Sequence, residues 1–89
     1  MPTVTFTQNI QRHVQCPPAT VEAATVREAL EAAFADNPRA RGYVLDDQGG
    51  VRTHMAIFVN GEPIRDRRGL SDAVPPDGEV YVMQALSGG

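Results

Sequence analysis

The sequence predicts a single α+β domain, in which one main helix packs on one face of a mixed sheet of four to five strands. Two observations predict it: strand-like stretches at both ends of the chain, and one amphipathic helix between them. A length of 89 residues allows one domain with one modest core, because a chain of this size buries roughly 60–70% of its unfolded surface. A deep cleft that holds a large cofactor is therefore not expected.

The first part of the chain predicts two strands. Residues 3–7 alternate strictly between threonine and apolar side chains, which is typical of a half-buried strand. Residues 10–15 carry a weaker alternation, with Ile10 and Val14 on one face. This second strand is expected to end at Pro17, since proline cannot donate to a strand ladder.

A helix is predicted to begin at Thr25. The Thr25 hydroxyl and the Glu28 carboxylate form a capping box, in which both side chains accept hydrogen bonds from backbone N–H groups at the helix start. Pro38 is expected to end the helix. One apolar stripe with helical spacing should face the core: Val26, Ala29, Leu30, Ala33 and Phe34.

The middle of the chain, residues 39–53, is interpreted as a segment inserted between the main elements. It contains a predicted short strand at 43–45 and a turn at 46–50. Gly49-Gly50 lacks the lysine and hydroxyl residue of a phosphate-binding loop, so a hairpin or mobile loop is preferred.

An apolar strand at 55–59 leads into Asn60-Gly61, a dipeptide that suits a type I′ turn. Pro63 confines the returning segment, residues 62–64, to a short edge strand. The charged run at 65–68 is interpreted as a solvated loop, because acidic residues dilute its arginines.

The last part of the chain supplies the centre of the sheet. A single helical turn at 70–74 is expected to place Leu70 in the core, and a sharp turn follows at 75–78. The final strand, 80–86, is apolar on both faces, as expected for a central strand. This order of elements favours a β-grasp, or ubiquitin-like, roll at residues 1–86, followed by a flexible tail at 87–89.

All eight cationic side chains are arginine, and the chain contains no lysine. With eleven acidic residues the formal net charge is -3, which argues against binding to nucleic acid or to an anionic membrane surface. Arginine codon bias explains the missing lysines most simply. A second explanation is that a chain with an activated C-terminus benefits from carrying no lysine ε-amine that could capture the acyl group in a neighbouring copy.

The single cysteine and the two histidines predict no metal site and no disulfide. Cys16 has no neighbouring base or cation, so we interpret it as a structural thiol. An unpaired cysteine, no visible signal peptide and no apolar run of about 20 residues together favour a cytoplasmic protein.

The sequence closes on Ser87, Gly88 and Gly89. One interpretation of such an end is a frayed tail without a function, because chain termini are often disordered. A glycine pair, however, can lie extended in a narrow channel of a partner's active site. The Gly89 carboxylate would be ionised at neutral pH and a poor electrophile, so it needs activation, for which acyl-adenylate formation from ATP is the obvious route. The sequence has no ATP site, so no cofactor is expected to bind here, and a partner enzyme would use the ATP.

Four segments carry a resemblance to the MoaD/ThiS family of β-grasp sulfur carriers, and the resemblance covers essentially the whole chain. These segments are 25–30 (Thr-Val-Arg-Glu-Ala-Leu), 57–61 (Ile-Phe-Val-Asn-Gly), 77–80 (Asp-Gly-Glu-Val) and 84–89 (Gln-Ala-Leu-Ser-Gly-Gly). The resemblance implies that Gly89 is adenylated by an E1-like enzyme and converted with a sulfur donor to a thiocarboxylate. A downstream sulfur-accepting enzyme would then receive the sulfur. The chain itself would be a carrier and not an enzyme.

Two departures from the family pattern bear on the pathway. Many members have proline where this chain has Gln84 and alanine where it has Ser87. The segment 39–53 is also longer than in thiamine-pathway carriers, so molybdopterin-type or cysteine-type carriers fit the length better. Two other functions stay open: a ubiquitin-like modifier joined through Gly89 to lysines of target proteins, and a β-grasp interaction module with an inert tail.

Apolar residues on the predicted strands are candidates for partner docking. Phe58, Tyr81 and Met83 lie on strands that are apolar on both faces, and strand alternation alone does not say which set points outward. Leu86, which adjoins the tail, is the better candidate.

Overall fold

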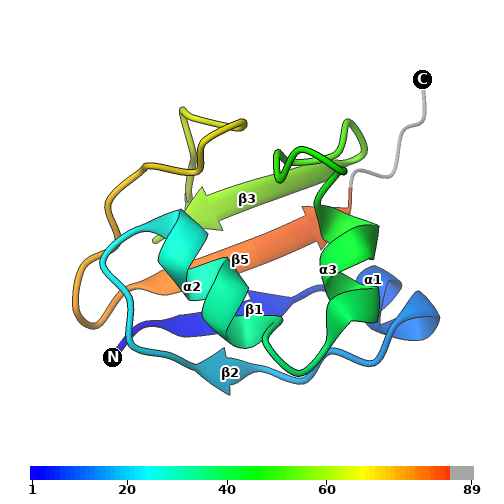
Figure 1. Cartoon of the computed structure of the whole chain (residues 1–89). Coiled ribbons are helices and arrows are strands. Elements are labelled where there is room, and N and C mark those ends of the chain that lie inside the picture. Colours follow the sequence, from blue (N-terminus) through cyan, green and yellow to red (C-terminus); the bar gives the residue numbers. More distant parts are fainter. Residues whose placement is uncertain (85–89) are drawn as a thin grey trace.

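The computed structural model describes residues 1–84, apart from the side chains of Asn9 and His13. Within these residues, five strands form one mixed sheet in the order β2-β1-β5-β3-β4 (Figure 1). The strands are β1 Thr3–Phe6, β2 Ala19–Thr20, β3 Met55–Val59, β4 Glu62–Pro63 and β5 Glu79–Gln84. The helices are α1 Gln8–His13, α2 Val26–Ala33 and α3 Pro38–Val44.

The first and last of these strands are neighbours at the centre of the sheet. β1 runs parallel to β5, with Val4 opposite Val80, and β3 runs antiparallel to β5 on its other side, with Ile57 opposite Val82. This topology confirms the predicted α+β class and the β-grasp arrangement, in which a helical segment connects the two halves of the sheet.

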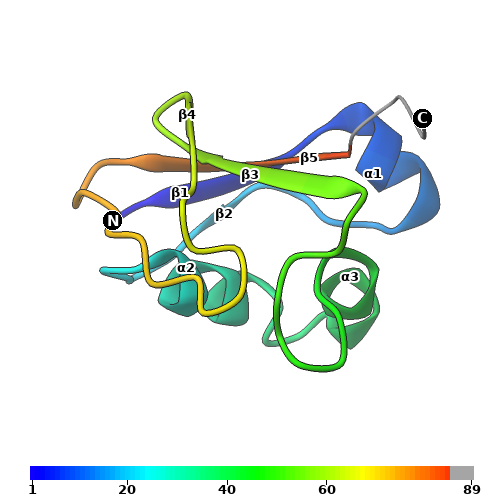
Figure 2. The ribbon, with the colours of Figure 1, turned by 90° about the horizontal axis from the view of Figure 1, so that it is seen from above.

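The core lies between the sheet and the helices on one of its sides. Figure 2 shows α2 and α3 on the same side of the sheet, so the predicted main helix shares this face with a second helix. Leu30 is fully buried, and the rings of Phe6 and Phe34 lie 5.8 Å apart between their centroids. The helix start is also confirmed, because Thr25 Oγ1 accepts from the backbone N–H of Glu28 at 3.2 Å.

The predicted strand at residues 10–15 is wrong, because this segment forms helix α1 and its C-cap. The backbone N–H of Gln11 donates to the carbonyl of Thr7, and that of Val14 donates to the carbonyl of Ile10. Ile10 and Val14 are both buried, and their spacing of four brings them to one helical face as readily as to one strand face. The two buried residues alone therefore do not distinguish a strand from a helix.

The predicted strand at 43–45 is also wrong, because residues 38–44 form helix α3. Pro38 was predicted to end the main helix, but it begins α3 instead. Helix α2 ends at Ala33, and Pro38 is the first residue of α3, where its missing N–H leaves no hydrogen bond unmade. Asn37 caps α3 by accepting from the backbone N–H of Ala40 at 3.2 Å. Ala40 and Val44, again four apart, are fully buried.

Leu70 is fully buried as predicted, but residues 70–74 do not form a helical turn. Leu70 has φ of 57°, which breaks a helical path. Two carboxylates organise the loop instead. Asp66 accepts from the backbone of Gly69 and Ser71, and Asp72 accepts from the backbone of Arg65 and Asp66.

The remaining turn predictions are confirmed. Asn60 and Gly61 have φ of 50° and 85°, the two positive values that a type I′ turn requires. β4 is a two-residue edge strand, as Pro63 led us to expect. Among residues 1–84, no helix has both the length and the apolar character needed to cross a membrane.

Candidate functional site

The predicted functional tail begins where the central strand ends. Gln84 is the last residue of β5, which is hydrogen-bonded to β1 along one edge and to β3 along the other. The predicted site residues Leu86, Ser87, Gly88 and Gly89 lie outside the described residues, so their roles stay predictions. The sheet nevertheless fixes the point from which the tail departs.

The structure places the three predicted docking residues on one face of the sheet. Phe58 lies opposite Tyr81 in the β3–β5 register, and Met83 lies opposite Ala56. All three side chains are partly exposed, whereas the alternate residues Ile57, Val80 and Val82 are buried. The helices α2 and α3 lie on the other side (Figure 2). We call this surface, formed by Thr5, Phe58, Tyr81 and Met83, the open face.

The open face is apolar at its centre and polar along one margin. Thr5 lies opposite Tyr81 in the β1–β5 register, and its hydroxyl is 3.4 Å from a carboxylate oxygen of Glu79. Two aromatic rings and a thioether thus lie next to each other on the side of the sheet away from α2 and α3.

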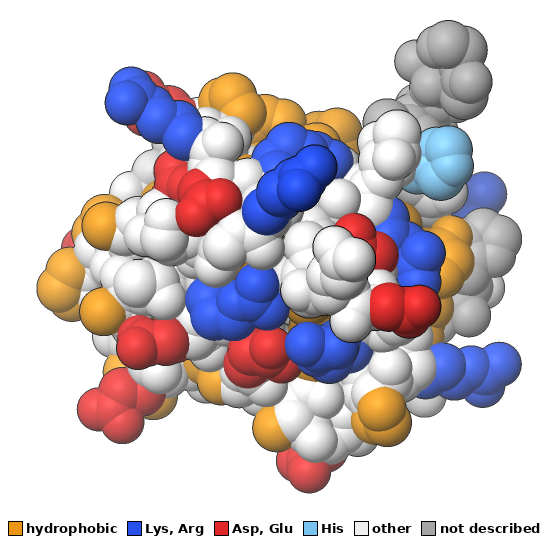
Figure 3. Space-filling view, turned by 45° about the horizontal axis from the view of Figure 1, so that its top comes forward, with side chains coloured by type: hydrophobic (Ala, Val, Ile, Leu, Met, Phe, Trp, Pro, Cys, Tyr) orange, Lys and Arg blue, Asp and Glu red, His pale blue; other side chains and the backbone are white. Residues whose placement is uncertain are grey.

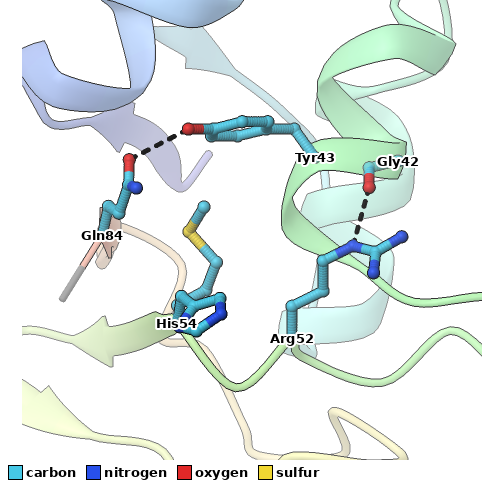
Figure 4. A pocket seen from close by; sticks show the side chains of 6 residues that line it. Gly42, Tyr43, Arg52, His54 and Gln84 are labelled. Atoms are coloured by element: carbon cyan, nitrogen blue, oxygen red, sulfur yellow. Dashed lines mark hydrogen bonds between the residues drawn. The ribbon is translucent and has the colours of Figure 1, made fainter. Parts of the chain in front are cut away.

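A pocket of about 290 Å³ lies beside the end of β5, on the helix side of the sheet. We call it the root pocket; it is lined by Gly42, Tyr43, Arg52, His54, Met55 and Gln84 (Figure 4). The Tyr43 hydroxyl donates to Oε1 of Gln84 at 3.1 Å, so α3 is tied to the last described residue of β5. Arg52 Nε donates to the carbonyl of Gly42 at 2.8 Å.

Sequence reasoning missed the root pocket because it treated residues 39–53 as loop and strand. The signal was present in Asn37-Pro38, which is a helix start, followed by apolar residues four apart at 40 and 44. With α3 assigned, Tyr43 falls on a helix next to the sheet, and its hydroxyl can reach the end of β5.

Arginine side chains hold the loops around the sheet. Arg27 in α2 donates to the carbonyls of Arg68 and Gly69, at 3.1 and 3.4 Å. Arg67 donates through one guanidinium nitrogen to the carbonyls of Arg52 and Met55, at 3.0 and 2.7 Å. The predicted solvated loop at 65–68 is thus tied down at two points, although its arginine side chains stay exposed.

Helices α2 and α3 are joined by ion pairs. Arg41 binds both carboxylate oxygens of Glu31, at 2.9 and 3.0 Å, and Arg27 reaches the same carboxylate at 3.3 Å. The hydrogen bond from Arg41 is the main cause that lowers the pKa of Glu31. Figure 3 shows cationic side chains interleaved with acidic ones across this face, rather than gathered into a single positive patch.

Cys16 and the histidines supply no nucleophilic or metal centre that the structure describes. Cys16 is buried, its thiol donates to the carbonyl of Val14 at 3.3 Å, and burial raises its pKa, which disfavours the reactive thiolate. His54 lies in the root pocket. Among residues 1–84, no three side chains of the histidine, cysteine or carboxylate type are grouped closely enough to hold a metal ion.

Comparison with solved structures identifies the fold. The chain superimposes on SAMP1 from Haloferax volcanii with a TM-score of 0.79 and 23% identity, covering 99% of this chain and 98% of that one. It matches a chain of the Amycolatopsis orientalis BexX/CysO complex with a TM-score of 0.81, 19% identity and full coverage of both chains. For Mycobacterium tuberculosis CysO the TM-score is 0.78 and the identity 19%, over 97% of this chain and 100% of that one.

A search of curated protein sequences gave no significant match. The sequence model of the ThiS family, in contrast, matches residues 14–89, which include Phe58, Tyr81 and Met83 of the open face, the root pocket and Gly88-Gly89. This span is most of the chain, and it agrees with the β-grasp topology of the sheet. The chain is therefore a member of the ThiS family.

Proposed function

We propose that this chain is a sulfur carrier, whose Gly89 carboxylate is adenylated by an E1-like enzyme and then converted to a thiocarboxylate. One observation carries the proposal: the match to the ThiS family includes Gly88 and Gly89. The thiocarboxylate then donates its sulfur to an accepting enzyme, so the reaction takes place on the chain but inside its partners.

The chemistry explains why partners are needed. A carboxylate is a poor electrophile, and adenylation replaces it with an acyl group that has AMP as its leaving group. A carboxylate oxygen attacks the α-phosphorus of ATP and pyrophosphate leaves. Hydrosulfide from the donor then attacks the acyl carbon, the new C–S bond forms as AMP leaves, and loss of a proton gives the thiocarboxylate with no change of oxidation state. In this scheme the partner enzyme binds the ATP, and the carrier contributes a narrow Gly-Gly end.

The open face supports a docking role. Phe58, Tyr81 and Met83 are adjacent on the sheet and partly exposed, and aromatic residues dominate the binding energy at many protein interfaces. Leu86 would extend this contact from the sheet toward the tail. We propose that the adenylating enzyme holds the open face while the tail enters its active site.

Intact-mass spectrometry tests the carrier function directly. The full chain is incubated with its adenylating enzyme, ATP and a sulfur donor, and exchange of one oxygen for sulfur is expected at the C-terminus. Deletion of Gly89 should abolish the product. Ser87→Ala is the matched control in the same tail, because many family members have alanine there, and it should still form the thiocarboxylate. Product from the chain without Gly89 would overturn the mechanism.

A second function, conjugation of Gly89 to lysines of target proteins, is favoured by one finding. Structures similar to this chain include SAMP1, which is described as a small archaeal modifier protein. An epitope-tagged chain expressed in its own cells separates the two functions. High-mass bands on a blot that resist reducing agents, and that disappear when Gly89 is deleted, would establish conjugation. A thiocarboxylate without such bands would establish a carrier alone.

The sulfur acceptor is proposed only by class. Molybdopterin-, cysteine- and thiamine-type acceptors are the three candidates, and one similar structure is a complex that contains CysO. Supplying the purified thiocarboxylate to each acceptor class and measuring sulfur transfer distinguishes them. We place this chemistry in the cytoplasm, where a reducing environment suits the unpaired Cys16.

A further inference from the structure

The eight cationic side chains of the sequence are all arginine, and the structure shows which of them need to be. Arg27, Arg41 and Arg67 each donate two or more hydrogen bonds from one guanidinium, to pairs of carbonyls or to both oxygens of a carboxylate. At Arg27 and Arg41 two nitrogens of the planar guanidinium make these contacts, and a lysine ammonium on a flexible stem does not reproduce such a fork. Arginine at positions 27 and 41 therefore has a structural explanation.

The other arginines lack this explanation. Arg52 donates one side-chain hydrogen bond, from Nε to the carbonyl of Gly42, and a lysine ammonium can donate to a carbonyl equally well. Within residues 1–84, four more arginines make no side-chain hydrogen bond and are exposed: Arg12, Arg39, Arg65 and Arg68. Lysine would satisfy the fold at all five positions.

Arg52 is distinguished from the other four by its location. It lines the root pocket together with Gln84, so it lies near the last described residue of β5 (Figure 4). Five residues separate Gln84 from the Gly89 carboxylate, and an extended chain of five residues spans up to about 17 Å. The tail is long enough to return its own C-terminus to the root pocket.

Arg65 lies at the opposite end of the sheet. It shares a pocket with Val59 and Asn60, which follow β3 away from the Met55–Gln84 pair. Because it is exposed and makes no side-chain hydrogen bond among the described residues, it offers a matched position with the same charge and a different distance from the tail.

We propose that the absence of lysine, and arginine at position 52 above all, keeps the activated acyl group of Gly89 from being captured by its own chain. This inference rests on the proposed function. An ε-amine at position 52 would attack the Gly89 acyl carbon. The new C–N bond would form as the bond to the leaving group, AMP or a thiol, breaks, and the nitrogen would release a proton to water. The product is a cyclic isopeptide with no carboxylate left to carry sulfur.

Arginine does not react in this way. Its guanidinium stays protonated and delocalised at neutral pH, so it has no free lone pair for the attack. Position 52 therefore keeps a cation and its hydrogen bond to Gly42 without presenting a nucleophilic amine to the tail.

The test uses the full chain as a C-terminal thioester, made by thiolysis of an intein fusion, so that no partner enzyme is required. Wild type, Arg52→Lys, Arg52→Gln and Arg65→Lys are incubated at mildly alkaline pH. Intact mass separates the hydrolysed chain from the cyclic product, which is lighter by one water. Proteolysis followed by tandem mass spectrometry then maps the cross-link, and circular dichroism checks that each variant folds.

The wild type and Arg52→Gln are expected only to hydrolyse, and Arg52→Lys is expected to cyclise between residue 52 and Gly89. At about 10 µM chain, an amine on a short tether with an effective concentration of about 1 mM captures the acyl group about 100-fold faster than an amine of a second copy. An amine at position 65 lies toward the other end of the sheet from Gln84, so Arg65→Lys should form far less cyclic product than Arg52→Lys. Equal partitioning in Arg52→Lys and Arg52→Gln, with both folded, would overturn the inference.

A separate arm distinguishes this inference from the proposed function. Wild-type chain with its adenylating enzyme and ATP must form the adenylate if the carrier function is right. Failure of that reaction would refute the proposed function, whereas the thioester result would still decide whether an amine at position 52 captures the tail.

Discussion

The two faces of the sheet are made by alternate residues of the same strands, yet their environments differ sharply. On the helix side Ile57, Val80 and Val82 are at most 1% exposed, while on the open face Phe58 and Tyr81 are partly exposed. A period of two residues therefore separates side chains that form the core from side chains that stay partly exposed on the other side of the sheet. One substitution should disturb one of these roles and leave the other largely intact.

The largest effect is expected on the helix side. Ile57→Ala removes buried methyl groups and leaves a cavity, so it should lower the free energy of unfolding by about 2–5 kcal/mol in chemical denaturation. Its neighbour Phe58, on the open face, provides the control. Phe58→Ala should cost clearly less, and equal losses at the two positions would mean that the faces are not separated in this way.

The second prediction concerns binding by the open face. Tyr81→Ala should weaken binding to the adenylating enzyme by about 2 kcal/mol or more, which is about 30-fold in Kd by calorimetry, because buried aromatic residues dominate such interfaces. The melting temperature should change little. Gln48→Ala, at an exposed position in the connection between α3 and β3 and outside the open face, is the control. Unchanged affinity in Tyr81→Ala would remove the open face from the docking model.

A smaller effect on the free energy of unfolding is expected at the start of α2, one of the helices on the helix side of the sheet. Thr25→Ala removes the acceptor for the backbone N–H of Glu28, and such a cap contributes about 1 kcal/mol. Thr25→Ser keeps the hydroxyl and should retain most of the stability. A loss of similar size in Thr25→Ser would show that the hydroxyl is not what stabilises this helix end.

The smallest expected effect is a loss of stability at acid pH. It arises in the loop at 64–74, between the edge strand β4 and β5. The Ser71 hydroxyl is the main cause that lowers the pKa of Asp66, and the backbone N–H of Arg65 is the main cause for Asp72. A lowered pKa means that the fold favours the carboxylate. This stabilisation is complete above the ordinary aspartate value of about 4 and is lost as the pH falls through the lowered values.

Melting temperature measured against pH tests this effect. Asp66→Asn should flatten the decline below about pH 4, since the group that loses its charge is gone. Asp77→Asn is the control, because Asp77 makes no side-chain hydrogen bond among the described residues. Parallel curves for the wild type and Asp66→Asn would show that Asp66 does not link stability to pH.

The elements that the sequence predicts correctly are those with one unambiguous period or one specific turn. Strict alternation identified β1, the Thr25 cap identified α2, and Asn60-Gly61 identified the hairpin. Helix α1 was missed because Ile10 and Val14 stand four apart, and this spacing fits one face of a strand and one face of a helix equally well. Helix α3 was missed because the consecutive apolar residues 43–45 were interpreted as a short strand.

The surface was harder to predict than the core. Alternation within each strand did not show that Phe58, Tyr81 and Met83 share one face of the sheet. The register, which pairs Phe58 with Tyr81, was needed for that. β2 escaped notice because two residues carry no period, and its place depends on pairing with β1. The root pocket required α3, so it could not be found while residues 39–53 were treated as loop and strand.

The position of β5 also has a mechanical consequence. An edge strand pulled by its end peels away one hydrogen bond at a time, whereas β5 is held by β1 along one edge and by β3 along the other. Force applied to the tail along the strand loads both ladders in shear, so many bonds must break together. Under the proposed function, a partner enzyme that pulls on the C-terminus would therefore load a strand that resists unfolding.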